Sequence, residues 1–260
     1  MSKIIYILSL IMAITFSSCE KVVKLDLKNG SNGIVVQGNI NNLEMGCVVQ
    51  LNGTINYYDS NNFPILNGAT VSISDSAGNT KTLNQNAIGN YQLLITGIPG
   101  RTYILKINYE GKEYTSSSTM PYPVPIDSLT FSSTRNNGYR MTCHFTDPGG
   151  ISNYYMIRYS SKLGQENFST NARVIDDRLT DGQPMAMTVR ANFTQFDTVT
   201  VNLECIDKGA FEFYNTLANA QGDLNPLLSS PPANPVSNIS NGGLGYFSAY
   251  SYTQKKVAVK

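Results

Sequence analysis

The sequence contains no tryptophan, one histidine and four cysteines, and only 14% of its residues are charged. The lack of tryptophan disfavours a sugar-stacking platform. The single histidine, His144, is the one imidazole that a Ser-His-Asp triad would have to use, and no Gly-x-Ser-x-Gly motif accompanies it. No Cys-x-x-Cys pair is present, which argues against a zinc site. We therefore expect no catalytic site, no cofactor and no metal centre.

Long apolar runs and an excess charge of either sign are also missing. Beyond the N-terminus, no segment reaches 18 consecutive apolar residues, so the pattern predicts no transmembrane helix. The chain has 19 basic and 18 acidic residues, and loss of Lys3 with a leader peptide would make it formally neutral. Nucleic acid is not an expected partner, because binding phosphates requires a basic surface. Abundant Asn, Ser, Thr, Gly and Tyr with few helical patterns favour an exported, all-β protein.

The N-terminus has the three parts of an export signal. Lys3 is followed by the apolar stretch Ile4–Phe16, and two serines then precede Cys19. The apolar stretch is shorter than the roughly 20 residues of a spanning helix. Small residues directly before a cysteine resemble the bacterial lipobox, in which the thiol is acylated. We predict cleavage after residue 18 and lipid attachment at Cys19, which would anchor the protein to a membrane. The alternative is an ordinary secretory signal with a chance cysteine.

The remaining chain divides into a tether and two β-rich parts. Residues 19–33 read as the tether, and closely spaced short strands over 34–120 predict a β-sandwich. Three prolines between Met120 and Pro125 mark the boundary, because proline cannot donate to a sheet ladder. Residues 121–260 are predicted to form a second β-rich domain.

One helix and one closing strand pair are predicted in the second domain. The apolar side chains of Asp207–Ala220 fall on one helical face. A final strand pair is expected over Gly243–Thr253. Before it, the glycine-rich segment Asn241–Phe247 superficially resembles a phosphate loop. It lacks the flanking strand and helix that such a loop needs, so we interpret its glycines as a tight entry into the last strand.

Cys47, Cys143 and Cys205 are widely spaced. Cys143 and Cys205 continue the apolar faces of predicted strands. This favours buried thiols, and a disulfide is left open.

Two tyrosine pairs are the candidate binding residues. In Tyr57-Tyr58 and in Tyr154-Tyr155, the alternation of a strand places one ring on each side, so one ring of each pair would face outward. Exposed tyrosine suits peptide, glycan or protein contacts. The alternative is that these rings only pack within the sheets.

Carboxylates offer a further candidate. Asp176, Asp177 and Asp181 lie close together near an Asp-Gly turn, and their hard oxygen ligands would suit calcium. The spaced pattern of a dedicated calcium loop is absent. A glycosidase carboxylate pair is also less favoured than ordinary turn chemistry.

Several motifs, taken in order, resemble a known family. Those of the first domain are Ile34–Ile40, Pro64–Val71, Gly89-Asn-Tyr91 and Gly100–Leu105, which look like a carboxypeptidase-regulatory or Ig-like β-sandwich. Those of the second are Asp147-Pro-Gly-Gly150, Asn153-Tyr-Tyr155, Asp176–Gln183 and Asn238–Phe247. Over essentially the whole mature chain, this order resembles the DUF4249 family of Bacteroidetes lipoproteins. The resemblance implies that the lipid anchor holds the protein on the outer membrane, on its cell-surface or periplasmic face.

The resemblance implies an accessory role rather than a reaction. Members of that family are often encoded beside TonB-dependent outer-membrane transporters, so a role in ligand capture or uptake is the expectation. The alternatives are a free-standing peptide- or glycan-binding module and, less favoured, a hydrolase using Asp176, Asp177 or His144. The family supplies no catalytic or binding residues to carry over.

Overall fold

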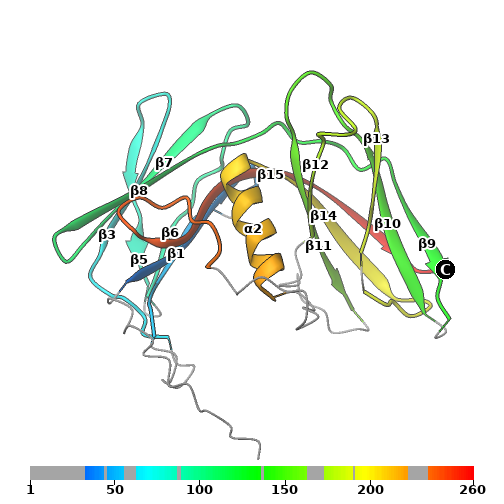
Figure 1. Ribbon diagram of the computed structural model, residues 1–260, viewed down its shortest axis with the longest axis horizontal. Helices are drawn as coiled ribbons and strands as arrows, with labels where there is room; N and C mark the ends of the chain where they lie inside the picture. Colours follow the sequence, from blue (N-terminus) through cyan, green and yellow to red (C-terminus); the bar gives the residue numbers. More distant parts are fainter. Residues whose placement is uncertain are drawn as a thin grey trace, which may run out of the picture.

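A computed structural model of the chain describes residues 33–43, 46–55, 63–86, 89–135, 138–162, 173–189, 191–221 and 234–260. Within these residues the polypeptide is almost entirely β, with one α-helix. Figure 1 shows two lobes joined by a shared sheet, with the helix lying between them. The predicted all-β class with one short helix is confirmed.

The first lobe is a sandwich of two sheets. Its strands are β1 (Ile34–Asn41), β2 (Cys47–Gly53), β3 (Thr70–Asp75), β4 (Thr80–Thr82), β5 (Asn84–Gln85), β6 (Asn90–Leu93), β7 (Thr102–Tyr109) and β8 (Lys112–Thr119). One sheet has the order β4-β3-β7-β8, and the other contains β1-β2-β6-β5. Alternate side chains of each strand point inward, so that Val36, Val49 and Leu105 meet in one apolar core. This arrangement buries one face of each sheet.

The second lobe repeats this architecture. Its strands are β9 (Ser128–Ser133), β10 (Tyr139–Thr146), β11 (Tyr154–Ser161), β12 (Arg173–Asp176), β13 (Pro184–Thr188) and β14 (Thr198–Ile206). A three-stranded sheet of order β13-β10-β9 shares a core with the sheet that contains β12, β11 and β14. Met141 and Phe145 of β10 and Leu203 of β14 are fully buried there. Each lobe therefore has its own apolar core.

The last strand, β15 (Leu244–Ala258), joins the two lobes. Residues 244–250 pair with β1 in parallel, and residues 251–258 pair with β14 in antiparallel. At roughly 3.3 Å per residue, its 15 residues extend about 50 Å, which is long enough to serve two sandwiches. The two outer sheets thereby merge into one eight-stranded sheet of order β12-β11-β14-β15-β1-β2-β6-β5.

This arrangement differs from the predicted linear division at residue 121. Ile239, Phe247 and Ala249 lie in the core of the first lobe, although they belong to the last part of the chain. The expected strand pair Gly243–Thr253 is instead one continuous strand. The chain returns to the first lobe because β1 pairs with β15, more than 200 positions away, and no local pattern signals that pairing.

The helix α2 (Lys208–Gln221) lies on the outer face of the second-lobe sheet. Asp207 caps it, since its Oδ1 accepts the N–H of Ala210 at 3.0 Å. Ala210, Phe211 and Tyr214 face the sheet. The predicted helix over 207–220 is thus confirmed within one residue. Among the described residues, no helix has the length and apolar character to cross a bilayer.

The segment between the lobes is held at both of its ends. Met120 is buried in the first core and Val124 in the second, with irregular backbone from 120 to 127. The hydroxyl of Thr253 donates to the carbonyl of Val124 at 2.7 Å. The proline-rich connector therefore packs against β15, which the two lobes share.

Cys47, Cys143 and Cys205 are buried free thiols, as predicted. Burial raises the pKa of the Cys143 thiol to about 12. These sulfurs therefore remain protonated and unreactive at neutral pH.

Candidate functional site

Two loops at one end of the second lobe are cross-linked by side-chain-to-backbone hydrogen bonds. Residues 147–153 connect β10 to β11, and residues 177–183 connect β12 to β13. Asp147 Oδ2 accepts the N–H of Gly182 at 2.8 Å, and Asp181 Oδ1 accepts the N–H of Gly150 at 2.8 Å. Each loop thus supplies a carboxylate to the backbone of the other. The result is a fixed pair of loops, which we call the double-loop tip.

Further bonds tighten the base of the tip. The N–H of Asn153 donates to Asp177 Oδ2 at 2.8 Å, and the N–H of Asp177 donates to the carbonyl of Asn153 at 3.2 Å. The backbones approach closely, because a Cβ placed on Gly149 would lie only 3.2 Å from Gly182 Cα. A side chain at this point would push the loops apart.

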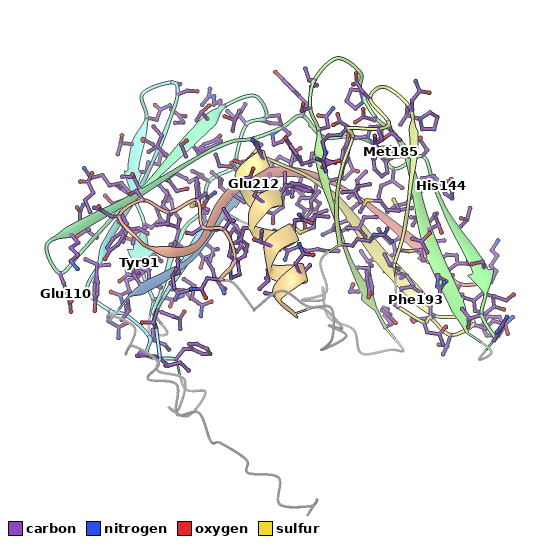
Figure 2. The ribbon with its side chains drawn as sticks, in the orientation of Figure 1. Tyr91, Glu110, His144, Met185, Phe193 and Glu212 are labelled. Atoms are coloured by element: carbon purple, nitrogen blue, oxygen red, sulfur yellow. The ribbon has the colours of Figure 1, made fainter. Side chains whose placement is uncertain are left out.

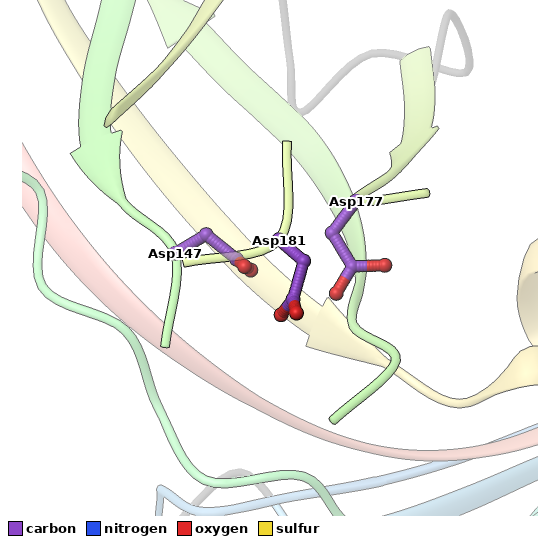
Figure 3. A group of neighbouring side chains, drawn as sticks. All are labelled: Asp147, Asp177 and Asp181. Atoms are coloured by element: carbon purple, nitrogen blue, oxygen red, sulfur yellow. The ribbon is translucent and has the colours of Figure 1, made fainter. Parts of the chain in front are cut away.

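Three carboxylates converge inside the tip (Figure 3). One oxygen from each of Asp147, Asp177 and Asp181 lies within 4.8 Å of the other two. Asp147 and Asp177 are buried, whereas Asp181 is exposed. Asp147 Oδ1 also accepts a short hydrogen bond from the hydroxyl of Tyr155. Each of the three carboxylates accepts a backbone N–H from the other loop, so their convergence is explained by their role in cross-linking the two loops.

The calcium set considered from sequence is only partly brought together. Asp177 and Asp181 meet, but Asp176 points to Arg178, with Asp176 Oδ2 2.7 Å from Arg178 Nε. Adjacent residues at a strand end project in opposite directions, so Asp176 and Asp177 separate. The third carboxylate of the cluster is that of Asp147, which lies on a loop about 30 residues earlier in the chain. No pattern in the sequence indicated this residue, because the two loops meet only through the pairing of distant strands.

The tip also presents apolar side chains to solvent. Leu179 is 97% exposed and Ile151 is 62% exposed, one on each loop. Exposed aliphatic side chains on a fixed backbone provide apolar area that a partner can bury with little loss of backbone conformational entropy. Fixed loops and exposed aliphatic groups together make the tip a candidate contact surface.

The second tyrosine pair does not offer a free ring. Tyr155 is fully buried in the second core, with its ring centroid 4.7 Å from that of Phe145. Burial, followed by its bond to Asp147, raises the pKa of the Tyr155 hydroxyl well above its usual range. Tyr154 does point to the other face of the sheet, but α2 covers it there, and its centroid is 4.9 Å from that of Phe211. Tyr154 and Tyr155 therefore pack within the fold.

Tyr57, Tyr58 and Cys19 lie outside the described residues. The predictions for binding by the first tyrosine pair and for lipid attachment remain predictions.

His144 lies on β10 in the second lobe (Figure 2). Its Nε2 is 2.8 Å from the hydroxyl of Thr130 on the neighbouring strand. This is a cross-strand contact of the kind that holds sheets together.

The glycine-rich segment forms a turn into β15, as its sequence indicated. Asn241 and Gly242 adopt positive φ values of 58° and 75°. At Gly245, with φ of 97°, a Cβ would lie 1.9 Å from the carbonyl oxygen of Val36. Glycine is required there so that β15 can approach β1.

A buried polar cluster beneath α2 was not predicted. Arg158 Nε lies 3.1 Å from Glu204 Oε1, and Arg158 Nη2 donates to the hydroxyl of Tyr214 at 3.0 Å. That hydroxyl in turn donates to the hydroxyl of Tyr246 at 2.7 Å. Burial raises the pKa of Glu204 to about 7, although the charge of Arg158 opposes this rise. The cluster ties β11, β14, α2 and β15 together across the junction of the lobes.

Two shallow hollows lie on the first lobe. The one of about 310 Å³ is lined by Lys81, Thr96 and Tyr103 beside an ion pair in which Arg101 Nη1 is 2.8 Å from Asp75 Oδ2. The other, of about 250 Å³, includes Gly33, Pro64 and Tyr109. Asp75 also accepts bonds from Asn79, so its carboxylate is already engaged by the protein.

Several solved structures are similar to this chain at low identity and low TM-score. A two fibronectin type-III domain segment from chicken tenascin is 12% identical, with 67% of this chain and 91% of that chain covered and a TM-score of 0.22. A cytokine receptor complex is 10% identical, with 85% and 94% covered and a TM-score of 0.26. The BSP domain of a biofilm-associated protein is 11% identical, with 87% and 29% covered and a TM-score of 0.26. No curated protein matches this chain.

A comparison with protein families identifies the family of this chain, which the structural similarities do not. The family described as a domain of unknown function, DUF4249, matches residues 20–256, which is nearly the whole chain after Cys19. The chain therefore belongs to the DUF4249 family.

Proposed function

We propose that this protein is an outer-membrane lipoprotein, anchored through Cys19, that acts as a non-catalytic accessory or ligand-capture partner of a TonB-dependent transporter. The observation that carries the proposal is the N-terminal segment, in which an apolar stretch and two serines lead directly into Cys19. The family match begins at residue 20, the position after this cysteine, which supports processing there. Two or more acyl chains would hold the protein durably, at about 0.8 kcal/mol per buried methylene.

The double-loop tip supports a role in protein contact. β1, which follows the predicted tether, begins at the lower edge of the first lobe, whereas the tip loops project from the upper edge of the second lobe (Figure 1). Leu179 and Ile151 are thus presented away from the point where the tether would enter. Because hydrogen bonds already fix both loops, docking would cost little ordering of the backbone.

The charge at the tip indicates what kind of surface would fit. Asp181 is exposed on the same pair of loops as the two aliphatic residues, and the carboxyl groups of the buried Asp147 and Asp177 lie close to it. Arg178 is the cation on these loops, and it is paired with Asp176. A suitable partner would present an apolar hollow with a basic rim.

Affinity purification from detergent-solubilised outer membrane tests the proposal. The tagged native protein should recover a TonB-dependent transporter, and the double variant Ile151→Ala/Leu179→Ala should lose it. Leu94→Ala is the matched control, because Leu94 is 76% exposed on the first lobe and outside the tip. Recovery of the native protein without a transporter would contradict the proposed partnership. Equal recovery by the tip variant would contradict the proposed contact surface.

A further inference from the structure

Most edge strands of this fold are protected against pairing with another strand. β4 and β5 are three and two residues long, and β12 carries charged residues at both ends. β13 begins with a proline, and the outer side of β8 bonds to the segment before β15, with the N–H of Ser240 donating to the carbonyl of Thr115 at 2.8 Å. Short length, charge, proline and cover are the usual devices that prevent edge-to-edge association.

β9 has none of these devices. It is six residues long, with the sequence Ser-Leu-Thr-Phe-Ser-Ser, and so contains no charge, no proline and no glycine. It ends the three-stranded sheet, at the outer edge of the second lobe in Figure 1. Among the described residues, no strand pairs with its outer side.

The backbone of β9 has N–H and C=O groups that point to its outer side, away from β10. The N–H of Thr134 donates to the carbonyl of Gly138 at 2.7 Å, which fixes the alternation of the strand relative to β10. In an antiparallel pair, alternate residues direct both backbone groups to the same neighbour. The N–H and C=O groups of Leu129, Phe131 and Ser133 therefore point outward.

The apolar side of the same strand is incompletely covered. Leu129 and Phe131 point to the second core but are only half-buried. The ring of Phe131 packs on one side, edge to face, against Phe193 with centroids 6.2 Å apart. A strand added beside β9 would both pair its backbone and cover these side chains.

We propose that the added strand is β9 of a second copy of this chain, in antiparallel orientation about a two-fold axis at Phe131. In this register, Leu129 pairs with Ser133 of the other copy and Thr130 with Ser132. The outward backbone groups then face one another as hydrogen-bonded pairs. An isologous contact needs one self-complementary patch, and an uncharged strand meets this requirement without repulsion.

The charges that flank β9 fit this occupant. Asp127 and Arg135 are exposed and lie just before and just after β9, so in an antiparallel pair the acidic end of each copy would meet the basic end of the other. The two three-stranded sheets would then form one six-stranded sheet that crosses the dimer. This inference is independent of the proposed transporter partnership.

Cysteine cross-linking of the full chain tests the register. Thr130→Cys with Ser132→Cys places thiols on directly opposed residues, where Cα atoms about 4.5 Å apart suit a disulfide. We expect a covalent dimer on mild oxidation in intact cells. Thr130→Cys with Thr134→Cys, two positions out of step, is the matched control and should give no covalent dimer on oxidation. The native chain, whose described thiols are buried, should give none either.

A proline at Ser133 tests whether the outward backbone carries the contact. Ser133→Pro removes an outward donor without removing a bond to β10, so the lobe should keep its melting temperature. Two interface hydrogen bonds are lost, one per copy, which should weaken association by roughly tenfold or more in sedimentation velocity of the full chain. Ser132→Ala should associate like the native chain. The proposal would be overturned if no dimer formed or if only the control pair Thr130→Cys with Thr134→Cys cross-linked. Capture of a different protein at β9 would also overturn it.

Discussion

Arg158 and Glu204 form an ion pair beneath α2, with Arg158 Nε 3.1 Å from Glu204 Oε1 and only 3% of the Glu204 side chain exposed. The other carboxylate oxygen of Glu204, Oε2, is buried without a hydrogen-bond partner. Tyr214 of α2 and Tyr246 of β15 complete the surroundings of the pair. A charge buried in this way is costly, and its cost depends on pH.

Glu204 should make the stability of the protein fall as the pH rises. Burial raises its pKa in the folded state to about 7 from the model-compound value of 4.5, so the folded state holds the proton more tightly than the unfolded state. The resulting stabilisation is fully present below pH 4.5 and is lost as the pH rises through 7. Glu204→Gln should therefore gain in melting temperature relative to the native chain between pH 5 and pH 8. A difference that does not change with pH would contradict this assignment.

Removing one partner of the pair should cost more than removing both. Arg158→Met leaves the buried carboxylate without its cation and should lower the free energy of unfolding by about 3 kcal/mol at pH 8. Arg158→Met with Glu204→Met replaces the pair by apolar side chains and should recover much of that loss. Urea denaturation of both variants measures the coupling. A double variant less stable than the single one would show that the pair itself stabilises the fold.

The Asp147 cross-link should hold the double-loop tip together. Asp147→Ala leaves the buried Tyr155 hydroxyl and the N–H of Gly182 without their acceptor, which should cost about 1–3 kcal/mol of stability. Tyr155→Phe is the control, because it removes only the hydroxyl and keeps the ring in the core. Hydrogen exchange at the Gly182 amide should accelerate in Asp147→Ala and stay slow in Tyr155→Phe. If the exchange rate of the Gly182 amide did not change in Asp147→Ala, the Asp147 carboxylate would not be the group that holds the two loops together.

Local patterns predicted much of the fold. The closely spaced short strands over 34–120 correctly indicated a β-sandwich, and the helical face over 207–220 predicted α2. Periodicity reports which side chains share a face, but it does not report which strand lies alongside. Periodicity therefore could not predict the parallel pairing of β1 with β15 or the sheet that both lobes share.

The same limit applies to the candidate site. Alternation correctly placed Tyr154 and Tyr155 on opposite faces, but it gave no sign that α2 would cover the face of Tyr154. Proximity in sequence grouped Asp176 with Asp177, whereas the fold groups Asp177 with Asp147. Contacts between distant segments determine both outcomes, and the sequence of one chain contains no direct record of them.

The proposed lipid anchor predicts a specific modification of Cys19. The mature protein from its native membrane should lack residues 1–18 and carry acyl chains on this residue, as measured by the mass of its N-terminal peptide. Cys19→Ser should carry no acyl mass and should keep its leader, because cleavage at a lipobox follows modification of the thiol. An unmodified thiol in the native protein would contradict both the anchor and the placement at the outer membrane.

Gly245 and Gly242 form a matched pair for testing how β15 joins the lobes. Both have positive φ, 97° and 75°, so alanine strains the backbone at either position, at about 1–2 kcal/mol. At Gly242 nothing lies within 4 Å of an added Cβ, and Gly242→Ala should cost no more than this strain. At Gly245 the Cβ would lie 1.9 Å from the Val36 carbonyl oxygen, so β15 must move away from β1. Gly245→Ala should therefore lose about 3 kcal/mol or more and speed hydrogen exchange along β1. Equal costs for the two variants would mean that β15 does not approach β1 so closely, and the sheet common to both lobes would be in doubt.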